Sequence, residues 1–461
     1  MSHAASGPAR TSVARSTHDL YRAVWRWHFY AGLLVLPFMI LLAVTGGIYL
    51  FKDEISDAAY GHLRLVEPVA TAPLAASAIV AGALADHPGT LTSYLPAAAP
   101  DRSAEVKIKG AGGIKDTVYV NPYTGAVLGS AWDAGSSGTE LMWIVRKLHS
   151  LELVGWWGNR LIEAVAGWSV VLVATGIFLW WPRGRDVGVL RVRNGNGRPF
   201  WRDLHAVTGL YAGVFIVFLA MSGLPWSGFW GNQFYDLSDK AGLGMPDGYW
   251  GSYPASTIPT GDLLERSPWI LEKQPMPVSG ASDGVPAGLD RIVATVEAAG
   301  IHPGYALNMP AGPTGGFTAS VYPDDITQER VIHLDQYTGD VLFDMTLADL
   351  GTLGRAAEWG VSLHMGQAFG LLNQLVLLGA CLAIVLLAVS GGVMWWKRRP
   401  AGAMGVPPMP VDRRAFLGLL AMLVMGGLFF PLVGLSLVAM LVLDQAYVRL
   451  TDRRKGRPHS A

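Results

Sequence analysis

Four long apolar runs, at residues 29–51, 161–181, 206–226 and 371–396, constrain the fold more than any other feature of this sequence. A helix of about 20 apolar residues is long enough to cross the hydrocarbon core of a bilayer, so each run predicts a membrane span. A fifth apolar block, at 415–443, is interrupted by Phe429-Phe430-Pro431 and predicts two shorter helices joined by a tight turn. The sequence therefore predicts a polytopic membrane protein with six spans.

The positions of arginine and lysine predict how the chain crosses the membrane, because short cytoplasmic segments carry an excess of positive charge. Basic clusters precede the first run, fill the second loop, follow the fourth run and end the chain. We therefore expect a bacterial inner-membrane protein with both termini in the cytoplasm and two long segments in the periplasm. The supporting residues are Arg10, Arg15, Arg22, Arg26, Arg183, Arg185, Arg191, Arg193, Arg198, Arg202, Lys397, Arg398, Arg399, Arg413, Arg414, Arg449, Arg453, Arg454, Lys455 and Arg457.

The predicted fold is mainly α-helical, with a four-helix core built from an internal repeat and a C-terminal helical pair. The expected order is a cytoplasmic N-terminus (1–28), the first helix (29–51), a periplasmic segment (52–140), an interfacial segment with the second helix (141–182), a basic cytoplasmic loop (183–204), the third helix (205–227), a second periplasmic segment (228–358), an interfacial segment with the fourth helix (359–397), a cytoplasmic loop (398–414), the helical pair (415–446) and a cytoplasmic tail (447–461).

Composition excludes several kinds of site. The single cysteine, Cys381, rules out an intramolecular disulfide, a multi-cysteine metal site and covalent c-type haem attachment. The formal net charge of +0 predicts no nucleic-acid partner. The sequence contains no phosphate-binding glycine motif in the context of a strand followed by a helix, so any nucleotide-dependent electron donor must be a separate protein.

An internal repeat relates the first half of the chain to the second. His28 precedes Thr45-Gly46 by 17 residues, and His205 precedes Ser222-Gly223 by the same interval. The outer segments repeat as well, with VYVNPYTGAVLGS in the first and VIHLDQYTGDVLFDM in the second. In the second and fourth runs the spacing from histidine to small-residue pair is 26 residues, for His149 with Thr175-Gly176 and for His364 with Ser390-Gly391.

The predicted topology pairs the four histidines by depth. His28 and His205 are expected near the cytoplasmic face, and His149 and His364 near the outer face. Two facing imidazoles at one depth suit bis-histidine ligation of haem, so the pattern predicts two b-type haems, with these four residues as the iron ligands. Zinc or copper would usually need a third or fourth donor, and the sequence places none at a suitable spacing.

Helix length sets a further expectation for the outer histidines. A continuous helix from His149 to Trp181 would be about 50 Å long, which exceeds the membrane. We therefore expect a separate interfacial turn, broken near Gly155 and Gly158, and a similar break near Gly370 after His364.

Other residues have weaker signals. Arg26, Arg146 and Arg202 flank the histidines and are possible partners of haem propionates, although basic residues at membrane ends are more often topology anchors. Glu163 is expected to be an interfacial carboxylate that reaches toward water, with proton handling as the alternative. Four further histidines are expected on the surface, namely His62, His87, His302 and His333.

These motifs resemble the PepSY-associated transmembrane family over nearly the whole chain. The resemblance is carried by WRWHFYAGLL, TGIFLWWPRGR, FWRDLHAVTGL and SGGVMWWKRR, and the two YTG segments resemble PepSY-type strand–turn–strand units. It implies two α+β PepSY-like periplasmic segments. Because the family includes inner-membrane di-haem reductases of ferric siderophores, it also implies electron transfer and iron uptake, and it supports the four histidines as haem ligands.

The functional hypothesis is a transmembrane ferric-chelate reductase, whose partners would be the lipid bilayer, a periplasmic ferric chelate as acceptor, and a cytoplasmic reductase or quinol as donor. The catalytic residues are not identified by the sequence. Two alternatives stay open. One is a non-redox PepSY-type regulatory or ligand-binding membrane protein, and the other is a haem conduit that serves a partner enzyme.

Overall fold

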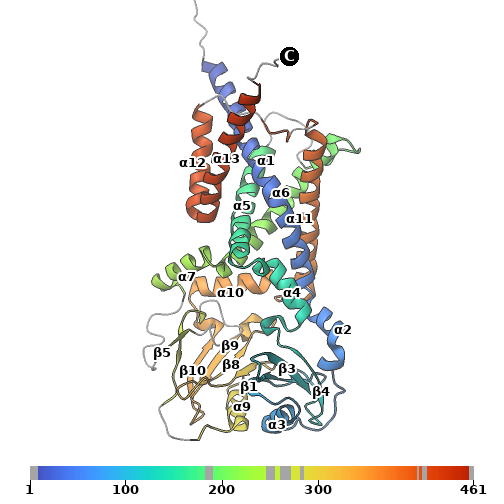
Figure 1. The fold of residues 1–461 in the computed structure, drawn as a ribbon, viewed down its shortest axis with the longest axis vertical. Coiled ribbons are helices and arrows are strands. Elements are labelled where there is room, and N and C mark those ends of the chain that lie inside the picture. Colours follow the sequence, from blue (N-terminus) through green and yellow to red (C-terminus); the bar gives the residue numbers. More distant parts are fainter. Residues whose placement is uncertain are drawn as a thin grey trace, which may run out of the picture. The chain divides into compact units, whose positions relative to one another are not determined.

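The structure of the 461-residue chain is a computed structural model that describes residues 9–181, 190–244, 255–259, 271–280, 285–401, 404–407 and 413–455. The chain forms two compact units (Figure 1). The helical unit consists of Met1–Val44, Ser150–Asn232 and Gly379–Ala461, and the sheet unit of Thr45–His149 and Gln233–Leu378. Of the basic residues that predicted the topology, Arg183, Arg185 and Arg457 lie outside the described residues.

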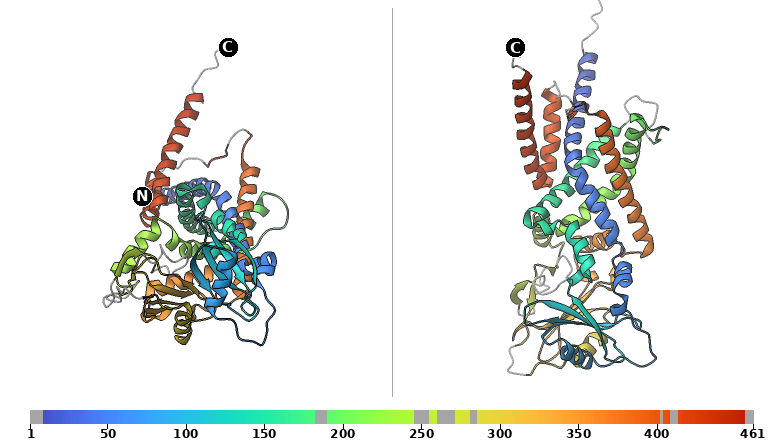
Figure 2. Two further views of the ribbon diagram at one scale, coloured as in Figure 1. Left: turned by 60° about the horizontal axis from the view of Figure 1, so that its bottom comes forward. Right: turned by 45° about the vertical axis from the view of Figure 1, so that its right-hand side comes forward.

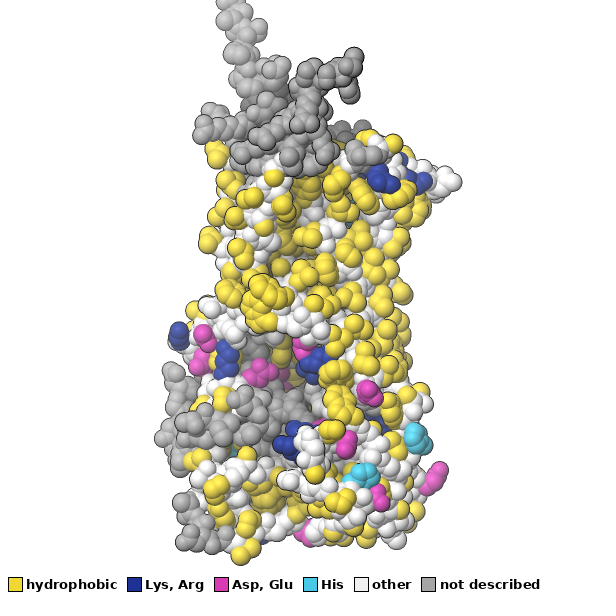
Figure 3. Space-filling model, viewed as in Figure 1, with side chains coloured by type: hydrophobic (Ala, Val, Ile, Leu, Met, Phe, Trp, Pro, Cys, Tyr) yellow, Lys and Arg dark blue, Asp and Glu magenta, His cyan; other side chains and the backbone are white. Residues whose placement is uncertain are grey.

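Four helices among the described residues are long and apolar enough to cross a membrane. Figure 3 shows that apolar side chains dominate the visible face of these helices, as contact with lipid requires. The prediction of a mainly helical polytopic membrane protein is therefore confirmed. The candidate spans are Leu20–Tyr49 of α1 (Ala9–Tyr49), α5 (Trp156–Trp180), Arg198–Trp226, which contains α6 (Arg198–Gly223), and α11 (Leu371–Arg398).

The predicted C-terminal pair is present as α12 (Arg413–Phe429) and α13 (Pro431–Lys455), which run side by side in Figure 1 and in the right view of Figure 2. The break falls at Phe430, where proline ends the first helix. α13 packs against α5 at Gly167, where an added Cβ would lie 2.6 Å from Val433 Cγ2. Neither helix is among the candidate spans found in the described residues, so the fifth and sixth crossings stay predictions.

The predicted breaks after His149 and His364 are confirmed. α4 (Glu140–His149) ends at His149, and α5 begins only at Trp156, after Gly155 with φ 77°. α10 (Thr352–His364) likewise ends at His364, and Gly370 with φ 56° precedes α11. Glycine suits both positions because a side chain disfavours positive φ. Both histidines therefore lie at the C-terminal ends of short helices outside the candidate spans.

The two long segments predicted at 52–140 and 228–358 form one antiparallel sheet of eight strands in the order β10-β9-β8-β7-β1-β2-β3-β4. Each half contributes one helix and four strands, and the halves join where β1 pairs with β7. The sequence predicted two PepSY-like α+β segments, and the structure shows that they share one sheet. The elements are α3 (Ala76–Asp86), β1 (Thr90–Leu95), β2 (Ala104–Lys109), β3 (Lys115–Val120) and β4 (Val127–Trp132), then α9 (Leu289–Ala298), β7 (Ala306–Asn308), β8 (Phe317–Val321), β9 (Arg330–Leu334) and β10 (Val341–Thr346).

One face of the sheet buries apolar side chains under α3 and α9, and Val331, Phe343 and Met345 belong to a separate core on the other face. Val106 and Val118 pack with Ile79 of α3, and Leu307 and Ile332 occupy the equivalent core beside α9. Alternation along each strand directs the intervening residues to the opposite face. Three further elements of the sheet unit are α2 (Lys52–Arg64), β5 (Ala255–Pro259) and β6 (Pro275–Pro277), while α7 (Trp230–Lys240) crosses the boundary between the units.

The two YTG turns show how closely the repeat is kept. Asn121 Oδ1 accepts the backbone N–H groups of Tyr123 and Thr124, at 2.9 and 3.2 Å. Asp335 Oδ1 does the same for the equivalent tyrosine and threonine, at 2.8 and 3.0 Å. The glycines that close the turns have φ 73° and 72°. The sequence repeat therefore reflects a repeated hydrogen-bonding unit.

Candidate functional site

His28 and His205 lie in neighbouring helices of the helical unit and are close enough to interact electrostatically. His28 Nδ1 is 2.9 Å from Thr175 Oγ1 of α5. The Thr175 hydroxyl donates its proton to the carbonyl of Val171 at 2.8 Å, so it accepts a hydrogen bond from Nδ1–H. This contact requires the tautomer in which the proton is on Nδ1, so Nε2 of His28 has the lone pair.

The His205 ring is held in the same way by α11. Its Nδ1 lies 3.0 Å from the carbonyl oxygen of Leu387 and 3.4 Å from Ser390 Oγ. A carbonyl can only accept, so Nδ1 again carries the proton and Nε2 the lone pair. Neutral imidazole with a fixed Nδ1–H donor and a free Nε2 is the form that binds metal ions.

His149 and His364 form the second pair, within the sheet unit. Their ring centres are 6.4 Å apart and their planes are inclined at 83°. Two imidazoles bound to one metal at about 2.0 Å per bond hold their ring centres roughly 6 Å apart, so the spacing fits a bis-histidine site. Partial loss of hydration, and secondarily the neighbouring His149, lowers the pKa of His364 to about 4, which keeps its imidazole neutral near pH 7.

Thr45 holds His149 as Thr175 holds His28. Thr45 Oγ1 lies 2.9 Å from His149 Nδ1. The following glycine provides room, because a Cβ on Gly46 would lie 3.4 Å from His149 Cε1. The same clearance recurs at Gly176 against His28, at 3.4 Å, and at Gly391 against His205, at 3.2 Å.

The small-residue pairs therefore position the histidine rings, and we call each pair of hydroxyl residue and glycine the seat of the histidine that it contacts. Each of the pairs at Thr45, Thr175 and Ser390 provides a hydroxyl for Nδ1 and a glycine that makes space for the ring. Sequence analysis found these pairs only as markers of the repeat and assigned them no role. Their constant spacing from a histidine was the signal, but it did not indicate which histidine each pair would contact.

The three predicted propionate partners bind protein groups. The buried Arg26 donates to the carbonyl of Pro407 and, at 3.3 Å, to Tyr30 Oη. Arg146 donates to Ser136 Oγ at 2.7 Å, and Arg202 donates to Asp203 Oδ1 at 2.8 Å. A propionate would have to share or replace these partners, so the assignment stays a prediction.

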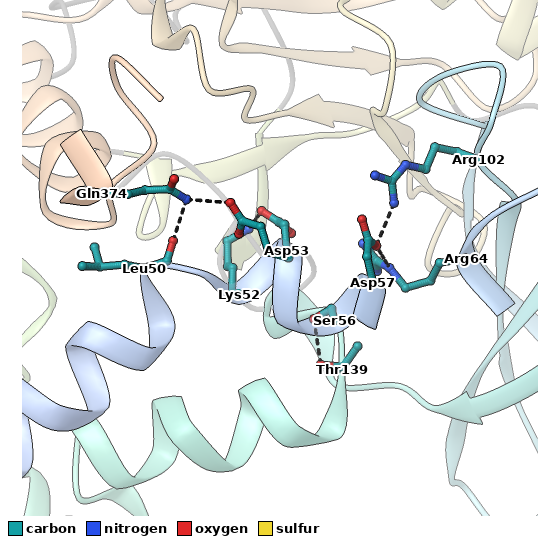
Figure 4. Close-up of polar contacts among 10 residues, drawn as sticks. Leu50, Lys52, Asp53, Ser56, Asp57, Arg64, Arg102, Thr139 and Gln374 are labelled. Carbon is teal, nitrogen blue, oxygen red and sulfur yellow. Dashed lines mark hydrogen bonds and ion pairs between the residues drawn. The ribbon is translucent and has the colours of Figure 1, made fainter. Parts of the chain in front are cut away.

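α2 makes polar contacts with Thr139, which precedes the helix that ends in His149, and with Arg102, which precedes β2 (Figure 4). Ser56 Oγ lies 3.1 Å from Thr139 Oγ1, directly before the helix that ends in His149. Asp57 accepts hydrogen bonds from Arg64 and Arg102, at 2.7 and 2.8 Å. Burial opposes the charge of Asp57, but the two guanidinium groups hold the pKa of its carboxyl below the usual range. The charge network fixes α2 against the sheet.

Two expectations about single residues are wrong. Glu163 is buried and does not reach toward water, because it accepts hydrogen bonds from Arg160 at 2.7 Å and from the backbone N–H of Trp230 at 2.6 Å. The second contact caps the N-terminus of α7, where a negative charge is favourable. His333 is fully buried in β9, with Nδ1 2.8 Å from Thr318 Oγ1, and is not a surface residue.

The chain matches the model of a known protein family over most of its length. The model of the PepSY-associated TM region matches residues 25–398, which contain both histidine pairs and the whole sheet. The chain belongs to this family. A search of curated proteins found no match. Membership agrees with the four helices that are long and apolar enough to cross a membrane.

Proposed function

We propose that this PepSY-associated protein is a di-haem electron-transfer protein of the inner membrane that reduces periplasmic ferric chelates. The observation that carries the proposal is the state of the histidines. In both members of the first pair, Nδ1–H is committed to an acceptor on another helix and Nε2 keeps its lone pair. The second pair has the ring separation expected for two ligands of one iron.

Four residues would hold the two b-type haems. His28 and His205 would hold one, and His149 and His364 the other. When bound, the haems would supply one-electron transfer in two stages across an apolar layer of roughly 30 Å. Thr45, Thr175 and Ser390 would orient the rings and raise the basicity of Nε2 by accepting from Nδ1–H.

The acceptor would be an external Fe(III) chelate, which takes up one electron and becomes Fe(II). Hard oxygen donors hold Fe(III) more strongly than Fe(II), so reduction would loosen the chelate. The electron would come from a quinol or a cytoplasmic reductase. The hydrogen-bonding role of the threonines holds for either donor.

The direct test is the haem content of the purified, detergent-solubilised chain after expression with adequate haem. We expect about two b-type haems per chain by pyridine haemochrome, and about one in each of His205→Ala and His364→Ala. His62→Ala is the matched control, because His62 is an exposed histidine of α2, and it should keep both.

Other results would support the alternatives. A folded wild-type chain without haem would overturn the redox proposal and favour a regulatory PepSY protein. Normal haem content, together with no reduction of ferric chelates by the dithionite-reduced protein, would favour a conduit to a partner enzyme.

A further inference from the structure

The two halves of the sheet meet at a short seam. β1 and β7 pair at only two positions, Ser93 with Asn308 and Tyr94 with Leu307. Next to this pairing is a hollow of about 260 Å³. It lies entirely within the sheet unit, and we call it the seam pocket. Its described lining residues come from 90–93, Lys115, 276–278, 308–311, 314–316 and Thr318.

A bulge in β1 shapes one wall of the seam pocket. The register between β1 and β2 shifts between Leu91 and Ser93, so that Thr92 is an extra residue. Its hydroxyl donates to the carbonyl of Lys107 at 3.1 Å, and its own carbonyl accepts the N–H of Met309 at 3.0 Å. Bulges redirect side chains and are common beside binding sites. Here the bulge directs the residues around it into the pocket wall.

Ser93 is the polar residue that most clearly lacks a protein partner. It is 4% exposed, and its Oγ has no hydrogen-bond partner among the described residues. Its neighbour Tyr94 packs into the core beside α3, so Ser93 points to the opposite face, where it lines the pocket. A buried hydroxyl without a hydrogen-bond partner is destabilising. An oxygen atom of a ligand in the pocket would satisfy it.

A polar row across the sheet provides further groups. Ser93 is paired with Asn308, Asn308 with Thr318, and Thr318 with His333. Directly paired residues share a face of the sheet, so these side chains lie side by side. Asn308 and Thr318 line the pocket beside Ser93. Asn308 adds an amide that can bind oxygen atoms, while the Thr318 hydroxyl lies 2.8 Å from His333 Nδ1.

The charge of the lining favours an anion. Lys115 is the only charged residue among the described lining residues, and no carboxylate lies there. Met276 and Met309 add apolar surface to the same wall. A carboxylate group of the ligand could bind Lys115. Its hydroxyl groups or other carboxylate oxygens could then form hydrogen bonds with Ser93 and Asn308.

We propose that the seam pocket binds a small hydroxycarboxylate. Its volume is slightly below the range of about 300–1,000 Å³ that is typical of pockets for drug-sized ligands, which suits a compact polyoxygenated anion. The proposal is independent of haem binding, because the pocket is lined by residues of the sheet unit that include none of the four histidines. It assigns a role to the joining of the two halves, since β1 and β7 each supply part of the wall.

Isothermal titration of the full-length protein in detergent tests the proposal, with citrate, malate and tartrate as probes and inorganic phosphate as the comparison anion. We expect saturable binding of at least one of the three, at one site per chain. Lys115→Gln and Asn308→Asp should each weaken it at least tenfold, the first by removing the cation and the second by adding a negative charge.

Two matched variants control for changes outside the pocket. Lys109→Gln removes the same charge from the residue paired with Lys115 across β2 and β3, and Ser137→Ala removes another buried hydroxyl that lacks a described partner. Neither residue lines the pocket, so both variants should bind within about twofold of wild type, whereas Ser93→Ala should bind more weakly.

Three results would overturn the proposal. The first is the absence of saturable binding at millimolar concentrations in a protein with a normal unfolding transition. The second is equal loss of affinity in Lys115→Gln and Lys109→Gln. The third is phosphate binding as tight as that of every organic anion. Because Lys115 is exposed, Lys115→Gln should fold even if Ser93→Ala does not.

Discussion

Thr175→Val tests the link between a small-residue pair and its histidine most directly. Valine keeps the shape of threonine but removes the oxygen that accepts from His28 Nδ1–H at 2.9 Å. An unsatisfied buried donor costs about 1–3 kcal/mol. Loss of a group that orients a metal ligand typically lowers affinity by about 10- to 100-fold, which agrees with that cost. We therefore expect haem to leave the His28–His205 site about 10- to 100-fold more readily.

The assay is transfer of haem from the purified protein to excess apomyoglobin, followed by absorbance. Thr175→Ser should restore near wild-type retention, because it keeps the hydroxyl. Thr208→Val is the matched control: Thr208 also precedes a glycine in a spanning helix, but a Cβ on Gly209 would face Leu387, at 3.2 Å, and no histidine. If Thr175→Val and Thr208→Val release haem at the same rate as wild type, the seat has no role in haem binding.

Three further predictions concern clearance, pH and a buried charge. Gly391→Ala should lower haem content at the first pair, because the new Cβ would lie 3.2 Å from His205 Cε1. Gly379→Ala should not, because a Cβ there would meet no described atom within 4 Å beyond its own helix backbone. Equal haem content in the two variants would contradict this prediction. Burial lowers the pKa of His333 from 6.5 to about 3. As the pH falls below 6.5, only the unfolded state takes up a proton at this residue. The free energy of unfolding should therefore be about 2 kcal/mol lower at pH 5 than at pH 7. Unfolding of wild type and His333→Gln at pH 7 and pH 5 measures this, and an equal pH dependence in the two proteins would refute it. Glu163→Gln should lower the unfolding temperature by leaving Arg160 as an uncompensated, mostly buried charge, an effect that Arg160→Gln in the same chain should partly reverse.

The helical architecture could be predicted from the sequence because membrane spans depend on length and hydropathy, which are local properties. The break after His149 was predictable for the same reason, since helix rise per residue limits how far one helix can extend. The joining of the two outer segments was not. It depends on β1 pairing with β7 through Ser93 and Asn308, residues 215 positions apart in the chain, and no periodicity within either strand indicates its partner.

The candidate site could be predicted in part. The repeat identified four histidines, and the structure brings His28 near His205 and His149 near His364. The sequence could not show that Glu163 and His333 are buried. A lone polar residue in an apolar or alternating segment has no local signal that indicates its partner. The partner of Glu163 is the N-terminus of α7, a helix that begins at Trp230, 67 residues later in the chain.

The contacts of the histidines give the repeat a physical meaning. Within the first half of the chain, α1 contributes His28 and receives His149 at Thr45-Gly46, while α5 contributes Thr175-Gly176 as the seat for His28. A seat works only at the depth of the ring it receives, so moving one histidine by a single turn would separate it from its hydroxyl by about 5.4 Å. The equal intervals of 17 and 26 residues in the two halves are therefore a constraint on ring position as well as on helix length. Duplication of one such half, with His28 on α1 and His149 at the end of α4, would supply two ligands to each pair, which is the arrangement that two bis-histidine sites require.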